Sequence, residues 1–356
     1  MRGGQAGSRQ RRACRRVFSG GTGMSEAMID ADRPILETRS LAKRFSIGTR
    51  FSAEGRRTVH AVDNVSLTVR RGETVGLVGE SGCGKSTLAR CLVRLYDITD
   101  GKLLFEGDDI TSKSLSELRP LRRRLQMVFQ DPSASLNPRR RVGDLVAEPL
   151  RIHGKLSAKE IAARVAELFE LVGLLPDYVM RYPHEFSGGQ RQRVGIARAI
   201  ALNPDLVVLD EPVSALDVSV QAQIVNLLAD LQEKLKLTYI FIAHDLSVVR
   251  QVSTRIAVMY LGSIVEEGPA EEVFATPAHP YSQALISAVP VVETTPTGTR
   301  KRIILTGDVP SPLKPPSGCR FHPRCPIAAD RCRSERPELK EYRPGRKVAC
   351  HFPTLT

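Results

Sequence analysis

The most constraining feature of this sequence is a nine-residue glycine-rich stretch, GESGCGKST, at residues 79–87. It fits the phosphate-binding pattern G-x-x-x-x-G-K-[ST], with Gly79, Gly84, Lys85 and Ser86 at the fixed positions. The run before it has the composition of a buried strand, and the run after it has apolar residues at helical spacing. A strand, this loop and a helix in succession predict a site that holds nucleotide phosphates on backbone N–H groups and a helix start.

The side chains of this loop have separate expected roles. Lys85 is expected to reach the β- and γ-phosphates, and the Ser86 hydroxyl to bind Mg²⁺. Phe45, upstream of the loop, suits either stacking on the nucleotide base or packing in the core. The loop residues that we expect to bind the nucleotide are Gly79, Glu80, Ser81, Gly82, Cys83, Gly84, Lys85, Ser86 and Thr87.

A second group of polar residues follows short apolar runs. The run at 206–209 is typical of a buried parallel strand and delivers Asp210 and Glu211 to its carboxyl end, where ligands bind in open α/β sheets. Gln130 and His244 each follow another such run. Phosphoryl transfer needs a metal, an oriented water and charge neutralisation, so we expect Glu211 to polarise the water and His244 to contact the γ-phosphate. Gln130 is expected to bridge metal and water. The expected Mg²⁺ ligands are Ser86, Gln130 and Asp210.

The order of strand and helix patterns predicts an α/β domain with a mostly parallel sheet. A helical pattern over residues 142–175 interrupts it, so we expect a helical subdomain at about 131–195. Near residue 275 the composition changes and prolines recur. This change predicts a nucleotide-binding domain at 34–275 and a C-terminal extension at 276–356.

The net charge of +13 is unevenly distributed, because the first 23 residues hold six arginines and no acidic residue. We expect residues 1–33 to be a disordered basic tail, with Met24 as a candidate start. A basic protein suggests a nucleic acid or an anionic surface as partner, but much of the excess lies in this tail. No apolar run approaches the roughly 18 residues of a membrane span, so a membrane role is expected to act through a partner.

The stretch Ser187-Gly188-Gly189-Gln190 leads into a predicted helix and is a second loop suited to anions. It resembles the signature motif of ATP-binding cassette (ABC) ATPases. The resemblance runs from residue 35 to about 267 and includes the phosphate loop, Gln130, the Asp210-Glu211 strand end, the loop at 214–217 and His244. Phe186 stands where many cassettes have leucine.

The resemblance implies a nucleotide-binding domain of the ABC type, with a RecA-like parallel sheet, an antiparallel β subdomain and a helical insertion. It implies that two cassettes pair head to tail, so that each signature covers the nucleotide on its partner's phosphate loop. ATP would then close the dimer, and hydrolysis would reopen it. The implied further nucleotide contacts are Ser187, Gly188, Gly189, Gln190 and Asp217. The implied partners are a second cassette subunit, identical or homologous, and two transmembrane permease subunits, to which Gln130 would report the γ-phosphate.

The C-terminal part narrows the resemblance. The motif His279-Pro280-Tyr281, the run 308–312 and a cysteine block resemble the extension of oligopeptide/dipeptide (and nickel) importer ATPases, which serve importers with a solute-binding protein. In those relatives the cysteines hold a 4Fe–4S cluster. Four thiolates suit an iron–sulfur cluster or zinc, and the missing C-x-x-C pair favours iron–sulfur. His322 and His351 keep zinc open as the metal. A separate alternative is that the four cysteines are buried thiols without a ligand. The four cysteines are Cys319, Cys325, Cys332 and Cys350.

Three functional interpretations follow from these patterns. The first, and the one the resemblance favours, is an ATPase that energises a peptide importer from the cytoplasmic face of the inner membrane. The second is a soluble cassette ATPase acting on nucleic acid or ribosomes. The third is a catalytically inactive regulatory cassette, against which Glu211 and His244 are both present. We expect no nucleic-acid partner, because this chain has one cassette, whereas the soluble relatives usually carry two in tandem, and because much of the excess positive charge lies in the tail.

Overall fold

The computed structural model describes residues 33–48, 57–154, 156–289 and 302–354. The described residues from Pro34 onward belong to one compact unit. The predicted disordered tail at 1–33 lies outside the described residues except for Arg33.

Two β-sheets organise the described residues. The larger sheet has the strand order β11-β12-β10-β9-β3-β8-β7-β6, and its centre is parallel, because β3 pairs with both β8 and β9 while β7 pairs with both β8 and β6. The smaller, antiparallel sheet has the order β2-β1-β4-β5. The bounds are β1 Pro34–Ile47, β2 Arg57–Arg70, β3 Thr74–Val78, β4 Asp100–Phe105, β5 Asp108–Asp109, β6 Leu125–Val128, β7 Leu206–Asp210, β8 Thr238–Ile242, β9 Arg255–Tyr260, β10 Ser263–Pro269, β11 Lys340–Arg343 and β12 Arg346–Val348.

The central strands are apolar throughout because both of their faces are covered. In β7, Leu206 and Val208 pack in one core with the smaller sheet and α2, whereas Val207 and Leu209 pack in another core with the helices. Since successive side chains of a strand point to opposite faces, an unbroken apolar run is what a strand between two layers requires.

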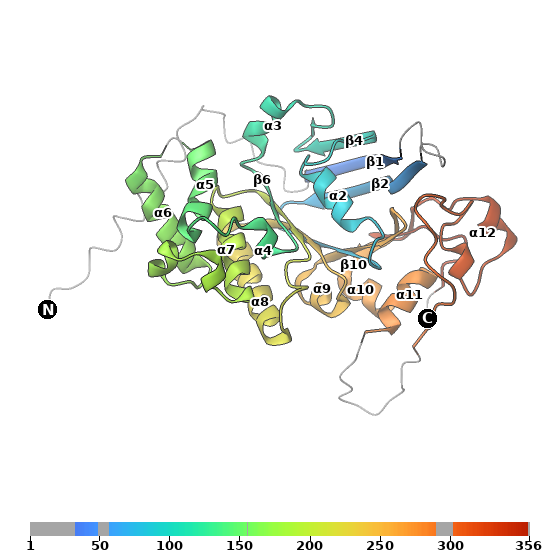
Figure 1. The fold of residues 1–356 in the computed structure, drawn as a ribbon. Helices are drawn as coiled ribbons and strands as arrows, with labels where there is room; N and C mark the ends of the chain where they lie inside the picture. The colour runs from blue at the N-terminus through green and yellow to red at the C-terminus, as the bar shows by residue number, and fades with distance from the viewer. Residues whose placement is uncertain (1–32, 49–56, 155, 290–301, 355–356) are drawn as a thin grey trace. The chain divides into compact units, whose positions relative to one another are not determined.

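The helices cover this sheet and carry the inserted block. Figure 1 shows α5, α6 and α7 grouped together, and these helices contact one another. No helix in the described part of the chain combines the length and the hydrophobicity needed to cross a bilayer. The bounds are α2 Lys85–Leu92, α3 Leu115–Leu121, α4 Pro132–Ser135, α5 Val142–His153, α6 Ala158–Leu171, α7 Gly188–Ile200, α8 Val218–Leu235, α9 Leu246–Val252, α10 Ala270–Ala275, α11 Pro280–Ser287 and α12 Asp330–Ser334, with short 3₁₀ turns at Pro176–Met180, Pro183–Glu185 and His322–Arg324.

The helical pattern predicted over 142–175 forms two helices, α5 and α6. Helix α5 ends before Gly154, and α6 begins after Ser157, whose hydroxyl accepts a hydrogen bond from the Glu160 N–H while the Glu160 carboxylate accepts one from the Ser157 N–H. This capping box starts a new helix in its own direction. Helix α6 buries an apolar face at Val165, Leu168 and Phe169.

The C-terminal extension continues the large sheet. Strand β12 pairs antiparallel with β10, so the composition change near residue 275 is not a break in packing. A buried ion pair joins them: Arg346 Nη2 lies 2.8 Å from Glu266 Oε1. The Glu266 carboxylate also accepts hydrogen bonds from the N–H groups of Ala278 and His279, at 2.9 Å each. The segment that enters the extension is therefore held by one buried carboxylate.

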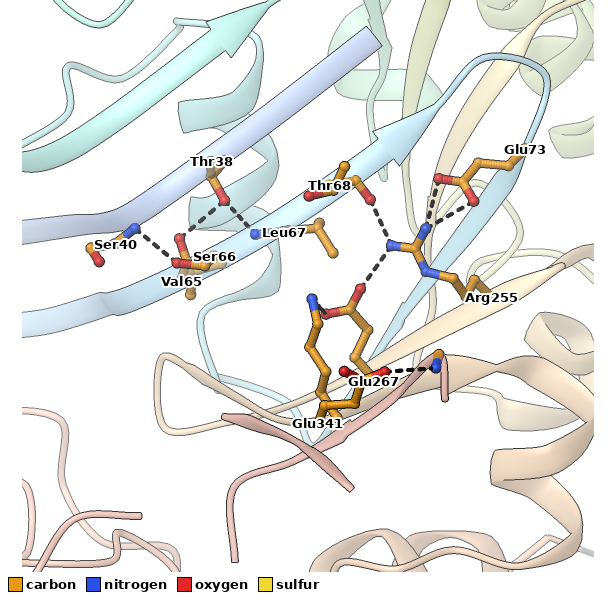
Figure 2. Close-up of polar contacts among 12 residues, drawn as sticks. Thr38, Ser40, Val65, Ser66, Leu67, Thr68, Glu73, Arg255, Glu267 and Glu341 are labelled. Atoms are coloured by element: carbon orange, nitrogen blue, oxygen red, sulfur yellow. Dashed lines mark hydrogen bonds and ion pairs between the residues drawn. The ribbon is translucent and has the colours of Figure 1, made fainter. Parts of the chain in front are cut away.

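A guanidinium joins the two sheets at the turn before the phosphate-loop strand (Figure 2). Arg255 of β9 lies 3.0 Å from the Glu73 carboxylate and 2.8 Å from that of Glu267 in β10, and it donates to the Thr68 carbonyl of β2 at 2.6 Å. These groups are mostly buried, and one cation between two carboxylates fixes where β3 begins.

Candidate functional site

The phosphate-binding loop lies between β3 and α2, as the sequence predicts. Gly84 precedes α2 with φ of +108°, and a Cβ there would lie 2.2 Å from the Ala61 carbonyl oxygen, so only glycine fits. The buried Lys85 ammonium donates to the carbonyls of Gly79 at 2.8 Å and Glu80 at 3.0 Å. The lysine side chain thus lies back against its own loop, where two backbone carbonyls accept hydrogen bonds from its ammonium group.

A hydroxyl and a carboxylate meet at the start of α2. Ser86 Oγ donates to Asp210 Oδ1 at 2.8 Å, and Asp210 is the buried last residue of β7. Burial raises the pKa of Asp210, and the Ser86 hydrogen bond, which favours the charged form, offsets only part of this effect. Hydroxyl and carboxylate oxygens are the ligand types that Mg²⁺ prefers, so the pair suits that metal.

Two polar side chains meet at the Glu211 carboxylate. Gln130 Nε2 donates to Glu211 Oε2 at 2.8 Å, and His244 Nδ1 lies 3.5 Å from the same oxygen. Glu211 has a φ of +47°, a left-handed conformation that is uncommon for a non-glycine residue and is often found at active sites. Its N–H donates to the Ile242 carbonyl of the neighbouring strand at 3.0 Å, which holds this conformation.

These groups surround one cavity of about 620 Å³, a size typical of small-molecule sites. The predicted residues that line it are Phe45, Ser81, Gly82, Cys83, Gly84, Lys85, Ser86, Thr87, Gln130, Glu211 and His244. Asp210 is not a lining residue but is hydrogen-bonded to one, Ser86, and Gly79 and Glu80 are not among the lining residues. Sequence reasoning missed further lining residues, which are Val59, His60, Ala61, Leu261, Gly262 and Pro312. Of these, only Pro312 belonged to a motif that the sequence had singled out.

Phe45 is held at the edge of this cavity by its neighbours. Its ring packs edge-on against Tyr96 at a centroid distance of 5.5 Å, and the Lys43 ammonium lies 4.9 Å from its centre. Both contacts leave part of Phe45 exposed, so the ring is presented to the cavity by a packed pair rather than buried as core.

The loop at Ser187–Gln190 forms the start of α7, away from the cavity within this chain. Ser187 Oγ accepts from the Gln190 N–H at 3.3 Å, and Gln190 Oε1 accepts from the Ser187 N–H at 3.0 Å. Gly189 lies against α8, where a Cβ would meet Val220 at 2.4 Å. Neither this loop nor Asp217, which precedes α8, is among the residues lining the nucleotide cavity.

A groove of about 680 Å³ lies beside the cavity, where α4, α5 and α7 meet β6. Gln130 lines both the groove and the cavity. The groove also includes Ile152 and Leu95, large apolar side chains that are 53% and 48% exposed, respectively. A surface of this kind, with exposed apolar side chains next to a ligand site, is suited to binding another protein.

The four C-terminal cysteines line one small cavity together with His279, Phe321, His322 and His351. All four carry free thiols, and burial raises the pKa of Cys319, Cys325 and Cys350, the last to about 11. Among the described residues, no group of three or more His, Cys, Asp or Glu side chains is arranged to hold a single metal ion.

Two family models match this chain. Residues 62–214 match the model described as ABC transporter, and residues 265–332 match the one described as oligopeptide/dipeptide transporter, C-terminal region. The oligopeptide transport ATP-binding protein AppF of Bacillus subtilis is 52% identical over 319 residues, which are 89% of this chain and 97% of AppF.

Solved structures are similar as well. A dimeric ATP-binding cassette in a post-hydrolysis state, bound to ADP and Pi, is 30% identical with a TM-score of 0.60, and the match covers 66% of this chain and 98% of that one. The protein cbiO1 of Clostridium perfringens, part of the ABC transporter complex cbiONQ, is 29% identical with a TM-score of 0.59, covering 68% and 92% of the two chains.

Proposed function

The chain belongs to the ABC transporter family, among the oligopeptide transport ATP-binding proteins, and we propose that it hydrolyses ATP to energise peptide import. The observation that carries this proposal is the meeting of Gln130 and His244 at the Glu211 carboxylate, beside a phosphate-binding loop. A carboxylate held at this point is placed to act on a water that attacks the terminal phosphate.

The residues divide the reaction between them. The loop N–H groups and Lys85 bind the phosphates, and Phe45 packs against the base. Ser86 and Asp210, with Gln130, would hold Mg²⁺, which neutralises charge that develops on the β- and γ-phosphates. Glu211 accepts a proton from the attacking water. His244, within 3.5 Å of that carboxylate, contacts the γ-phosphate and keeps the water in line.

A second cassette completes the site. The Ser187 loop does not line this chain's cavity, and its N–H groups at the start of α7 suit the phosphates of a nucleotide on a partner. The dimeric cassette bound to ADP and Pi, which resembles this chain, supports such an arrangement. ATP then closes a head-to-tail dimer, and hydrolysis reopens it; Asp217 is proposed to lie at that interface.

The groove beside Gln130 is the proposed docking site for one of the two permease subunits, at the cytoplasmic face of the membrane. Its exposed Ile152 and Leu95 offer apolar surface, and its shared residue Gln130 can transmit the presence of the γ-phosphate. The importer would include a solute-binding protein outside the membrane, whose selectivity lies beyond this chain.

The cysteine cavity is the proposed site of a 4Fe–4S cluster, with zinc as the alternative. Its support is that four cysteines separated by up to 31 positions, from Cys319 to Cys350, line the same small cavity without forming disulfides. Thiolate sulfur is the ligand that iron–sulfur clusters and structural zinc both use. The bound group would stabilise the extension, because the helices and strands in the described part of the extension are short.

The test measures the ATPase activity of the chain after it has been assembled with its permeases in vesicles. Peptide-loaded binding protein should stimulate the activity, and labelled peptide should enter the vesicles only with ATP. The alternative, an ATPase acting on nucleic acid or ribosomes, predicts stimulation by RNA, DNA or ribosomes and none by peptide. The similarity to an oligopeptide transport protein favours the first outcome.

A further inference from the structure

The C-terminal extension is hydrogen-bonded to the phosphate-binding loop at Glu80. The Arg324 guanidinium donates from Nη1 to Glu80 Oε2 at 2.7 Å and from Nη2 to Oε1 at 3.0 Å, although 244 positions separate the two residues. The Arg324 side chain is only 7% exposed. A parallel two-bond pair between a buried guanidinium and a carboxylate is both strong and geometrically specific.

A second contact reaches the same residue from α11. The Glu80 N–H donates to Tyr281 Oη at 2.8 Å, and Tyr281 is fully buried. The Glu80 carbonyl, in turn, accepts from Lys85 Nζ at 3.0 Å. The backbone N–H and the side chain of Glu80 are therefore held by two parts of the extension, α11 and the segment that carries Arg324, while the Glu80 carbonyl accepts a hydrogen bond from the lysine of the loop.

The residues that contact Glu80 rest on a packed aromatic cluster. Tyr281 lies 4.7 Å from Tyr260 and 5.4 Å from Phe321 between ring centres, and Tyr260 lies 5.2 Å from Phe321. Phe321 and Tyr260 are each 1% exposed. Phe321 also lines the cysteine cavity, and Arg324 immediately precedes Cys325. Arg324 therefore lies between the aromatic cluster and the cysteine cavity along the chain.

We infer that Arg324 and Tyr281 are positioning residues for the nucleotide site, through which the extension fixes the conformation of the phosphate-binding loop. This inference rests on the proposed ATP site. A loop whose second residue is fixed on three sides does not have to be ordered by the nucleotide, so less of the binding free energy is lost to ordering. Without these contacts, Glu80 would lose its partners, and the carbonyls that hold Lys85 would move.

The test compares ATP affinity of the full chain and its variants, measured with a fluorescent ATP analogue. Arg324→Gln should weaken binding by roughly tenfold, with kcat in the assembled transporter changing less than KM. Arg324→Lys should recover only part of the loss, because lysine cannot form the two-bond pair. Glu80→Gln, alone or combined with Arg324→Gln, should lose no more ATP affinity than Arg324→Gln does. The reason is that each of these variants removes the same interaction, the Arg324–Glu80 pair.

The matched control is Arg336→Gln. Arg336 belongs to the same extension and pairs with a carboxylate at 2.7 Å, but its partner, Asp63, lies in β2 and not in the phosphate loop. The affinity of the Arg336→Gln variant for ATP should stay within about twofold of wild type. The inference is overturned if Arg324→Gln binds ATP as tightly as wild type, or if Arg336→Gln loses as much. Failure of the proposed function is a different outcome, because the wild-type chain would then not bind ATP at all.

Tyr281→Phe guards against a variant that does not fold, because it removes one oxygen and keeps the aromatic packing. Amide hydrogen exchange of residues 79–87 without nucleotide should be faster in Tyr281→Phe than in wild type, while exchange in α8 is unchanged. Equal exchange in the loop of both proteins would contradict the inference.

Discussion

Gln130 Nε2 donates a hydrogen bond to Glu211 Oε2 at 2.8 Å, and the same glutamine lines the groove between α5 and α7. One side chain thus contacts the proposed catalytic carboxylate and a surface suited to a partner. A shift of the helical block relative to the sheet would stretch or break this hydrogen bond. The Gln130–Glu211 pair therefore links the proposed catalytic carboxylate directly to the proposed permease site.

Gln130→Ala should uncouple ATP binding from stimulation of the ATPase by the permease. Its ATP affinity should remain within about twofold of wild type, because Lys85 and the loop amides still bind the phosphates, whereas stimulation of the ATPase by permease and peptide should fall roughly tenfold. Binding of a fluorescent ATP analogue and phosphate release in vesicles measure the two quantities. Weak ATP binding with normal stimulation would contradict the proposed role.

Ser86→Ala should weaken the dependence on Mg²⁺. The substitution removes the hydroxyl that lies 2.8 Å from Asp210, so the Mg²⁺ concentration that gives half-maximal activity should rise roughly tenfold or more. Titration of Mg²⁺ at fixed ATP measures it. Ser116→Ala serves as the control, since Ser116 is exposed on α3 and should leave the titration unchanged.

Glu266→Ala should destabilise the junction with the extension. It leaves the buried Arg346 guanidinium without its carboxylate, so the free energy of unfolding should fall by about 3 to 5 kcal/mol. Glu271→Ala is the matched control: it removes an exposed pair with Arg250 and should cost at most about 1 kcal/mol. Urea denaturation of both variants compares them, and equal losses would contradict the account of the junction.

If the cysteine cavity holds the proposed 4Fe–4S cluster, the purified protein should contain iron. Protein purified without oxygen should contain about four irons per chain and show the absorbance of a 4Fe–4S cluster. Cys332→Ser should lose the iron, and Cys91→Ser, in a buried position of α2, should keep it. One zinc per chain and no colour would favour the zinc alternative. Neither metal would contradict both.

The local part of this site could be predicted from the sequence. The strand at Thr74–Val78, the loop and the helix that follows it are encoded by neighbouring residues, and the structure confirms that strand with the same bounds. The apolar run at 206–209 predicts a buried parallel strand with Asp210 and Glu211 at its end. In the structure Asp210 is the last residue of β7, and Glu211 follows it. Their chemical roles stay predictions.

The contacts across the chain could not be predicted from one sequence. Glu80 meets Tyr281 and Arg324 over separations of 201 and 244 positions, and no local pattern records which residues a fold brings together at such distances. His60 and Pro312 reached the cavity in the same way, through a hydrogen bond from the His60 N–H to the Pro312 carbonyl. The expected boundary near residue 275 reflected composition, whereas the pairing of β12 with β10 depends on tertiary packing.

The most direct test of the central claim is phosphate release from Mg²⁺-ATP by the wild-type chain and by Glu211→Gln. The account predicts that the variant keeps ATP affinity and loses roughly a hundredfold or more in kcat, because it lacks the carboxylate that accepts the water's proton. Wild-type activity with an equally active Glu211→Gln, both above the Lys85→Ala background, would contradict the account, since another residue would then activate the water.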